Sequence, residues 1–178
     1  MGKTINESRA GGFLSRVTRI GVVAGTHPEL ARGAASALSS VDRILHAGRI
    51  GAENVLRQLG EIAPVIAVAG DQDYLSFGDR FPEIVELDLG GASLLMTPMI
   101  GTPPEWLAPI KTRLEQSQPS ILVHADALVA EIRWFGGTLL VNPGRAGVPQ
   151  PPGRSATCAV IEIDGPGRID ARIVDLSP

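Results

Sequence analysis

Short apolar runs recur along the chain, and each ends in a polar turn that contains glycine. In the first half of the chain, runs at 19–24, 42–47 and 64–69 alternate with segments of helical period at 29–38 and 52–59. Apolar runs of this length between helices are typical of strands that are buried on both faces. The pattern therefore predicts a βαβαβ unit with a parallel sheet.

The second half of the chain has the pattern of antiparallel strands. The pairs Gly90–Gly91 and Gly136–Gly137 each separate two apolar runs, which is typical of a two-residue hairpin turn. A helix is expected at 104–116, with Pro104 near its first turn, where a missing N–H costs little. The predicted strands lie at 84–89, 92–97, 120–124, 128–135, 138–142, 156–163 and 168–176. A parallel half joined to an antiparallel half, with helices outside, predicts the α/β class and a two-sheet α/β/β/α sandwich.

The length of 178 residues suits a single hydrophobic core. Residues 1–17 are polar and show no sustained period, so we expect them to form a flexible N-terminal extension. Residues 18–178 are expected to form one domain.

Composition and charge narrow the classes of partner. The formal net charge is only -3, so the chain has no basic field to hold a nucleic acid. No apolar stretch is long enough to span a membrane, and no signal peptide is recognisable. Cys158 is the only cysteine, which excludes an internal disulfide and a thiolate-rich zinc site. We therefore expect a cytoplasmic protein with neither nucleic-acid nor membrane partners.

Polar side chains gather in the turns that follow the predicted strands. Ligands of parallel α/β sheets bind outside the carboxyl ends of the strands, where these turns converge. The turns contain all three histidines of the chain, in the segments 25–27, 46–49, 70–73, 97–98, 124–126 and 142–145. They predict a binding site at this end of the sheets, although turns are also rich in polar residues for purely structural reasons.

Several of these residues have a structural interpretation. His46 and His124 end apolar strands and are expected to be buried histidines bonded to neighbouring backbone groups. Asp73 is expected to accept hydrogen bonds within its turn or at a helix start. His27 is equally compatible with a site residue and a helix cap, and Arg154 is expected to be a solvated charge.

Four segments together resemble a known family. VVAGTHP, ILHAGRIG, APVIAVAGDQD and LLVNPGRAG occur in this order within residues 19 to about 176. In this respect the chain resembles the small calcineurin-like metallophosphoesterases of the bacterial and archaeal phosphodiesterase type. The same fold includes the retromer subunit, which works as a protein-binding scaffold. The resemblance implies the two-sheet sandwich inferred above.

The resemblance also implies a pair of divalent metals, but most of the ligand positions are changed. His27 matches a family ligand, and Asp71 and Asp126 are carboxylate substitutes. The other ligand positions hold residues that do not coordinate metals, namely Gly25, Arg49, Pro98 and Leu128. Asn142 matches the family's later turn, where Arg145 replaces a small hydroxyl residue.

Arg49 stands where the family has the carboxylate that bridges both metals. A unit positive charge about 4 Å from another costs about 4 kcal/mol at an effective dielectric of 20, and a divalent ion doubles this cost. We therefore predict that the two-metal centre is absent and that no cofactor is bound. We also predict that Arg49 pairs with Asp71 and Asp126. The alternative is manganese or another divalent metal held by His27, Asp71 and Asp126.

Three functions are compatible with these residues. The first is a non-catalytic binding or scaffold module, with an unknown protein partner or self-association. The second is a phosphodiesterase or phosphatase with an atypical one-metal or metal-free site, in which His27 is the general base and Arg49 steadies the phosphoryl group. The third is a phosphate or nucleotide binding protein. The predicted pocket comprises His27, Arg49, Asp71, Asp126, Asn142 and Arg145, of which His27, Arg49, Asp71 and Asp126 would be catalytic in an active enzyme.

Overall fold

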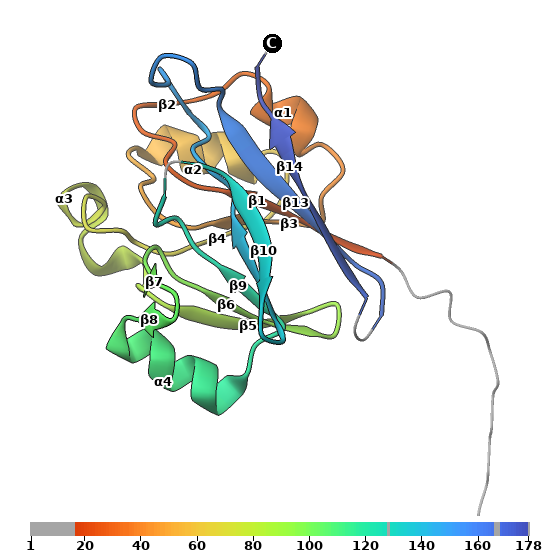
Figure 1. Ribbon diagram of the computed structural model, residues 1–178. Helices are drawn as coiled ribbons and strands as arrows, with labels where there is room; N and C mark the ends of the chain where they lie inside the picture. Colours follow the sequence, from red (N-terminus) through yellow and green to blue (C-terminus); the bar gives the residue numbers. More distant parts are fainter. Residues whose placement is uncertain (1–16, 128, 166–167, 178) are drawn as a thin grey trace, which may run out of the picture.

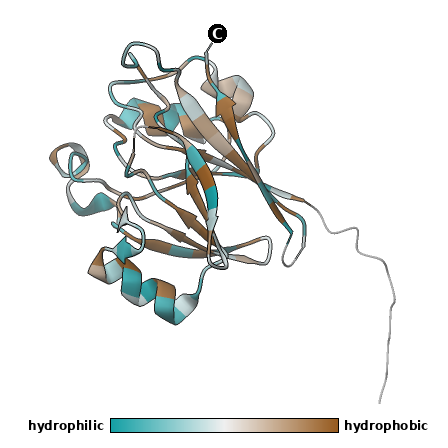
Figure 2. Ribbon diagram, in the orientation of Figure 1, coloured by the Kyte–Doolittle hydropathy of each residue, from teal (hydrophilic) through white to brown (hydrophobic). Residues whose placement is uncertain are grey.

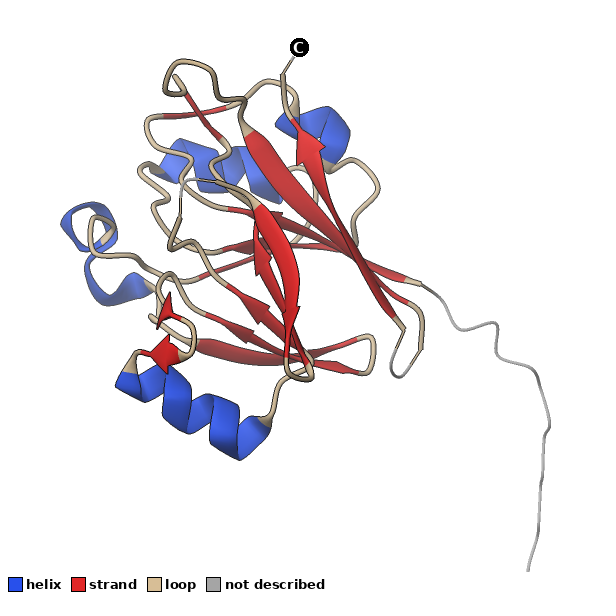
Figure 3. Cartoon of the chain, in the orientation of Figure 1, coloured by secondary structure: helices blue, strands red, loops and turns tan. Residues whose placement is uncertain are grey.

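Two five-stranded sheets pack face to face with helices on the outside (Figures 1 and 3). The computed structural model describes residues 17–177, apart from residues 128, 166 and 167. Helices α1 (Ala34–Ala37) and α2 (Glu53–Gly60) cover the first sheet, and α4 (Ala108–Ser117) covers the second. The predicted α/β/β/α sandwich is confirmed. The proposed extension lies outside the described residues, except for residue 17.

The first sheet has the strand order β14-β13-β1-β3-β4. Its strands are β1 (Thr18–Val23), β3 (Arg43–His46), β4 (Val65–Ala67), β13 (Thr157–Ile163) and β14 (Ile169–Asp175). β1, β3 and β4 run parallel, as the βαβαβ pattern predicts. The C-terminal hairpin joins this same sheet, with β13 antiparallel to β1.

The second sheet has the order β10-β11-β9-β6-β5. Its strands are β5 (Val85–Leu89), β6 (Ala92–Met96), β9 (Ile121–Val123), β10 (Glu131–Phe135) and β11 (Thr138–Asn142). Both glycine pairs form the predicted hairpin turns, and Gly90, Gly91 and Gly136 have φ values of 63°, 85° and 60°. The expected division into a parallel and an antiparallel half is wrong, because β6, β9 and β11 also run parallel.

Three buried clusters hold the layers together, and most strand residues are hydrophobic (Figure 2). The cluster between the sheets includes Ile20, Val22, Leu45, Leu94, Met96, Ile121, Val123, Leu139, Val141 and Ile161. The two outer clusters pack α1 and α2 on the first sheet and α4 on the second. Aliphatic burial of this kind supplies the main folding free energy and leaves polar side chains to the loops.

The helix predicted at 29–38 is largely wrong. Residues Glu29–Leu30 form strand β2, which pairs with β12 (Gly147–Val148), and only the short α1 follows. A Cβ on Gly147 would lie 2.6 Å from the carbonyl oxygen of Gly25, so a glycine is required for this close approach. Pairing with a segment far along the chain therefore overrides the local helical period.

The helix predicted at 104–116 begins later. A small hairpin of β7 (Gly101–Thr102) and β8 (Glu105–Trp106) precedes it, and the proline in its first turn is Pro109 rather than Pro104. The pattern also does not predict helix α3 (Tyr74–Phe77) or the 3-10 turn Gly78–Arg80. Within the described part of the chain, no helix has the length and apolar character needed to cross a membrane.

Candidate functional site

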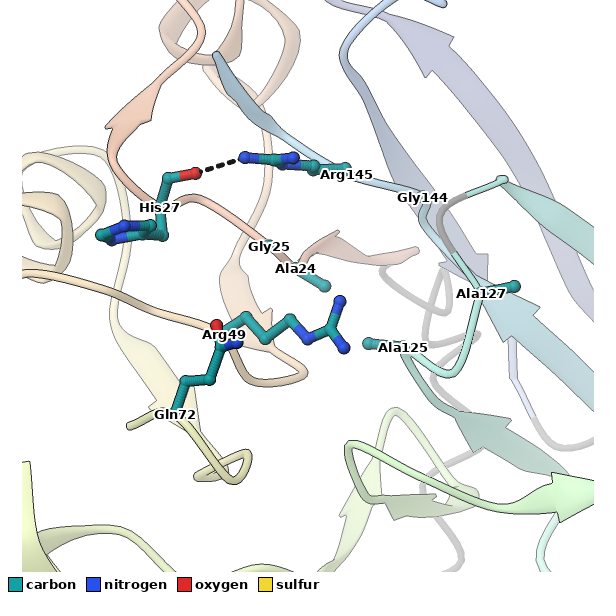
Figure 4. Close-up of a pocket in the computed structure, with 9 residues that line it drawn as sticks. All are labelled: Ala24, Gly25, His27, Arg49, Gln72, Ala125, Ala127, Gly144 and Arg145. Carbon is teal, nitrogen blue, oxygen red and sulfur yellow. Dashed lines mark hydrogen bonds between the residues drawn. The ribbon is translucent and has the colours of Figure 1, made fainter. Parts of the chain in front are cut away.

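The parallel strands of both sheets end at one side of the sandwich, where their loops surround a cavity (Figure 4). The cavity has a volume of about 280 Å³. It is lined by Ala24, Gly25, His27, Arg49, Gln72, Ala125, Ala127, Gly144 and Arg145. The loops after β1, β3 and β4 form one wall, and the loop after β9 lies opposite.

The carboxylate of Asp73 organises the wall formed by the first sheet. Oδ2 accepts hydrogen bonds from the backbone N–H groups of Arg49 at 2.7 Å and Gly70 at 2.8 Å. Oδ1 accepts from Ile50 at 2.7 Å and Gly51 at 3.3 Å. Consecutive N–H groups that point into one concavity form an anion-binding nest, and here a buried side chain of the protein fills it. Asp73 is therefore an acceptor within its turn, as predicted.

Arg49 is held in an unusual backbone conformation by these bonds. Its φ is 58°, in the left-handed region that costs a residue with a side chain about 1 kcal/mol or more. The bond from its N–H to Asp73 offsets this cost. Its guanidinium extends across the cavity toward Ala125 of the opposite wall (Figure 4).

The predicted ion pairs of Arg49 with Asp71 and Asp126 are not formed. Of the ion pairs among the described residues, none includes Arg49. The carboxylate of Asp126 instead accepts the backbone N–H groups of Ile100 at 2.8 Å and Gly101 at 3.0 Å. Asp71 is exposed, so water stabilises its charge without a partner. The three residues still line one small adjoining cavity of about 110 Å³.

Arg145 joins the site through the loop that follows β11. Its Nη2 donates to the carbonyl oxygen of His27 at 2.7 Å. The backbone N–H groups of Ala146 and Gly147 donate to the carbonyls of Ala24 at 2.8 Å and Gly25 at 3.0 Å. These bonds tie the last loop of the second sheet to the first loop of the first sheet and place a second guanidinium at the cavity.

His27 and Asn142 differ in their relation to the cavity. The ring of His27 is exposed and points away from the guanidinium of Arg49 (Figure 4). Asn142 is 1% exposed, and its Oδ1 accepts the N–H of Gly144 at 2.9 Å while its Nδ2 donates to the carbonyl of Ala127 at 3.0 Å. Asn142 thus shapes the loop and is not among the lining residues.

His46 is a buried structural histidine, as predicted. The hydroxyl of Thr26 donates to the carbonyl of Ile50 at 2.8 Å, so the 2.9 Å bond between this hydroxyl and Nε2 requires an Nε2–H donor on His46. Nδ1 then accepts the N–H of Gly48 at 3.3 Å. Burial lowers the pKa of His46 to about 4, although the charge of Asp73 acts in the opposite direction.

His124 is also buried, at 6% exposed, but its Nδ1 has no hydrogen-bond partner among the described residues. The expected bond from this ring to a neighbouring backbone group is therefore not formed at Nδ1. Burial, aided by the positive charge of Arg133, lowers the pKa of His124 to about 4. Both buried rings are therefore neutral at pH 7.

The sequence profile of the calcineurin-like phosphoesterase superfamily domain matches residues 18–165. This chain belongs to that superfamily. A probable metallophosphoesterase of Methanocaldococcus jannaschii is 26% identical over 164 residues, which span 88% of this chain and 81% of that protein. The sequence resemblance to metallophosphoesterases is thereby confirmed.

Solved structures share the fold of this superfamily member at low sequence identity. Vps29 of Chaetomium thermophilum has a TM-score of 0.71 at 14% identity, covering 88% of this chain and 97% of that one. The same Vps29 was also solved in complex with a cyclic peptide, with a TM-score of 0.65 at 15% identity, covering 89% and 96%. A predicted phosphoesterase of Streptococcus pneumoniae has a TM-score of 0.68 at 18% identity, covering 90% and 91%.

The residues present do not fit the metal pair that the superfamily implies. No group of three or more His, Cys, Asp or Glu side chains within the described ranges could hold a metal ion. His27 points away, Asp126 is occupied by backbone donors, and Arg49 brings a positive charge to the cavity. Leu128, which takes a ligand position in the resemblance, lies outside the described residues.

Sequence reasoning did not select Gln72 or the small residues Ala24, Ala125, Ala127 and Gly144 as lining residues. Gln72 stands next to Asp71 in a turn already marked as part of the site, so its position was the available signal. The small residues carry no chemical group that a pattern could reveal, and only the fold brings them to the cavity.

We expect Asp73→Ala to destabilise the protein by at least about 3 kcal/mol, because buried N–H groups would lose their acceptor. The exposed Asp71→Ala is the control and should change the free energy of unfolding by no more than about 0.5 kcal/mol. Urea denaturation of both variants measures the difference. Equal losses in the two variants would contradict the role assigned to the Asp73 carboxylate.

The protein should become less stable as the pH is lowered, because His46 and His124 have folded pKa values of about 4, below the ordinary value of 6.5. Their contribution is complete above pH 6.5 and is lost between pH 6.5 and 4, by about 3 kcal/mol for each residue. Urea midpoints across this range measure the slope. His124→Phe should make the slope shallower, whereas the exposed-residue control His27→Phe should not.

Proposed function

We propose that this protein is a non-catalytic binding module that uses the phosphoesterase fold to present the guanidinium of Arg49 to a protein partner. The observation that carries the proposal is the position of Arg49, whose side chain extends through the cavity formed by the strand-end loops. Asp73 holds the backbone of Arg49 in place, so the side chain extends from a fixed point of the scaffold. A permanent cation at this point opposes the binding of a divalent metal there.

Apolar side chains around the cation support a protein partner. Leu75 is 95% exposed and lines a cavity of about 390 Å³ that also includes His27 and Arg49. Met99 is 48% exposed and lines a smaller cavity together with Arg49. Exposed apolar residues next to an arginine are typical of protein interfaces, in which arginine and aromatic residues are enriched. The matching partner would present a carboxylate or phosphate to Arg49 and apolar residues to Leu75.

The structural neighbours are consistent with this proposal. The Vps29 of Chaetomium thermophilum binds a cyclic peptide in one of its structures, so a protein of this fold can bind a peptide ligand. For this chain we also propose a cytoplasmic location, in keeping with its single cysteine, which is a buried free thiol.

A second candidate function is the binding of a small phosphate-containing ligand. The specific observation in its favour is that no ion pair among the described residues neutralises Arg49. Arg145 lines the same cavity. The cavity volume of about 280 Å³ suits a small ligand. Guanidinium groups bind phosphate through paired, charge-assisted hydrogen bonds.

The primary proposal predicts no metal-dependent hydrolysis. We expect the purified protein to release no nitrophenol from bis-p-nitrophenyl phosphate with added Mn²⁺ beyond the level measured with chelator, because no donor set among the described residues could hold the metal. Metal analysis of the same sample should find less metal than protein. Turnover that chelator abolishes would overturn the proposal.

The second candidate predicts that inorganic phosphate binds and that Arg49→Gln weakens its affinity by about tenfold or more, because a charge-assisted hydrogen bond is lost. Arg154→Gln is the matched control, since Arg154 is exposed and is not among the lining residues. Calorimetric titration measures both affinities. Absence of phosphate binding by the unmodified protein would contradict this candidate and leave the protein-partner proposal standing.

A further inference from the structure

Strand β10 is an open edge of the second sheet. It is the first strand in the order β10-β11-β9-β6-β5 and pairs on one side only, with β11. Among the described residues, no strand pairs with its outer edge. An unpaired edge offers N–H and C=O groups to another strand, and proteins commonly protect such edges.

The hairpin turn determines which backbone groups face this open edge. Phe135 and Thr138 flank the two-residue turn and are therefore a hydrogen-bonded pair of the ladder. Bonded and non-bonded pairs alternate along an antiparallel ladder, so Arg133 also directs its backbone groups toward β11. Ile132 and Trp134 direct theirs outward, where a further strand could pair with them.

Exposed apolar side chains are concentrated along the same segment. Val129 is 55% exposed, Trp134 59% and Phe135 36%. Trp134 and Phe135 are adjacent in the strand and therefore point to opposite faces of the sheet, and the ring of Phe135 packs edge-on against that of Trp106, with centroids 5.3 Å apart. The tryptophan is especially costly to leave in water because of its large apolar area.

Two opposite charges flank the middle residue of the segment. Glu131 and Arg133 point to the same face of the sheet, since they are two residues apart, and their side chains are 3.3 Å apart. Both side chains are solvent-accessible, at 56% for Glu131 and 37% for Arg133. An antiparallel copy of this strand presents the same three residues in the reverse order. An acid in one copy would then face a base in the other, on both sides of Ile132.

We propose that β10 pairs with β10 of a second copy of this chain, antiparallel and centred on Ile132, so that the second sheet continues across a two-fold axis. In this register Ile132 faces Ile132, and Glu131 of each copy faces Arg133 of the other. Ile132 directs its backbone groups outward, so the centre forms a hydrogen-bonded pair. The charged residues then occupy non-bonded positions, where opposing side chains are closest.

Charge selects this register over its neighbours. A centre at Arg133 would place two arginines face to face, and like charges directly opposite each other are destabilising. A centre at Trp134 would leave Glu131 without an opposing residue. The edge strand of the first sheet, β14, is a weaker candidate because none of its residues is among the exposed large apolar side chains of the described residues.

Charge reversal tests the proposal directly. The full-length protein should show a concentration-dependent dimer in sedimentation equilibrium. Glu131→Arg and Arg133→Glu should each weaken the dimer by about tenfold or more, because two like-charged pairs form in each homodimer. The double variant Glu131→Arg/Arg133→Glu should restore it, because opposite charges face each other again.

Mixing the two single variants gives the most specific result. The Glu131→Arg variant has arginine at both positions, and the Arg133→Glu variant has glutamate at both. Opposite charges therefore face each other when the two variants pair, so the mixture should form a heterodimer although neither variant dimerises alone. The control is Glu61→Arg, at the residue that follows α2. Glu61 is an exposed acid that would also lose its own arginine partner, Arg57 at 3.1 Å, and this variant should dimerise normally. A monomeric unmodified protein, undisturbed single variants, or a mixture without heterodimer would each overturn the proposal.

Discussion

A buried carboxylate holds together the loops on which the candidate site is built. Asp73 accepts N–H groups from two separate loops, those after β3 and β4, and it is 1% exposed. An anion in this position is stable only because every donor points at it, and the donors are satisfied only because the anion is there. The conformation of Arg49 and the outline of the cavity both follow from this mutual dependence.

The second sheet has its own, simpler set of bonds on the opposite side of the cavity. Asp126 fixes the backbone of Ile100 and Gly101, and Asn142 fixes that of Gly144 and Ala127. Side chains at strand ends are thus used to shape loops. A carboxylate that accepts two backbone donors is less free to serve as a metal ligand, which explains why a carboxylate at a ligand position is not sufficient to make a metal site.

The superfamily membership implies a pair of metals in the cavity, whereas the side chains of the described residues there do not fit metals. The fold depends on aliphatic packing between two sheets, and that packing does not require the metal ligands at the strand ends. Substitutions at the ligand positions can change the cavity from anionic to cationic while the layers remain intact. Arg49 and Arg145 both line the cavity, and under the proposed function their charges favour carboxylates and phosphates as ligands.

The sequence by itself determined the buried strands and both hairpin turns, and it placed the permanent charge of Arg49 in a loop that follows a strand. Apolar runs and glycine pairs act over a few neighbouring residues, so their effect can be read locally. The charge of Arg49 does not depend on its surroundings, because a guanidinium remains protonated in proteins.

Only the tertiary structure decided how these parts combine. The placement of β13 and β14 beside β1, the pairing of β2 with β12 and the partners of Asp126 all join segments far apart along the chain. A carboxylate bonds to whichever donor the fold brings within about 3 Å, whether a guanidinium or a backbone N–H. The local sequence pattern carries no information about that distance. For this reason it could not show that Asp126 bonds to the backbone N–H groups of Ile100 and Gly101 instead of to Arg49.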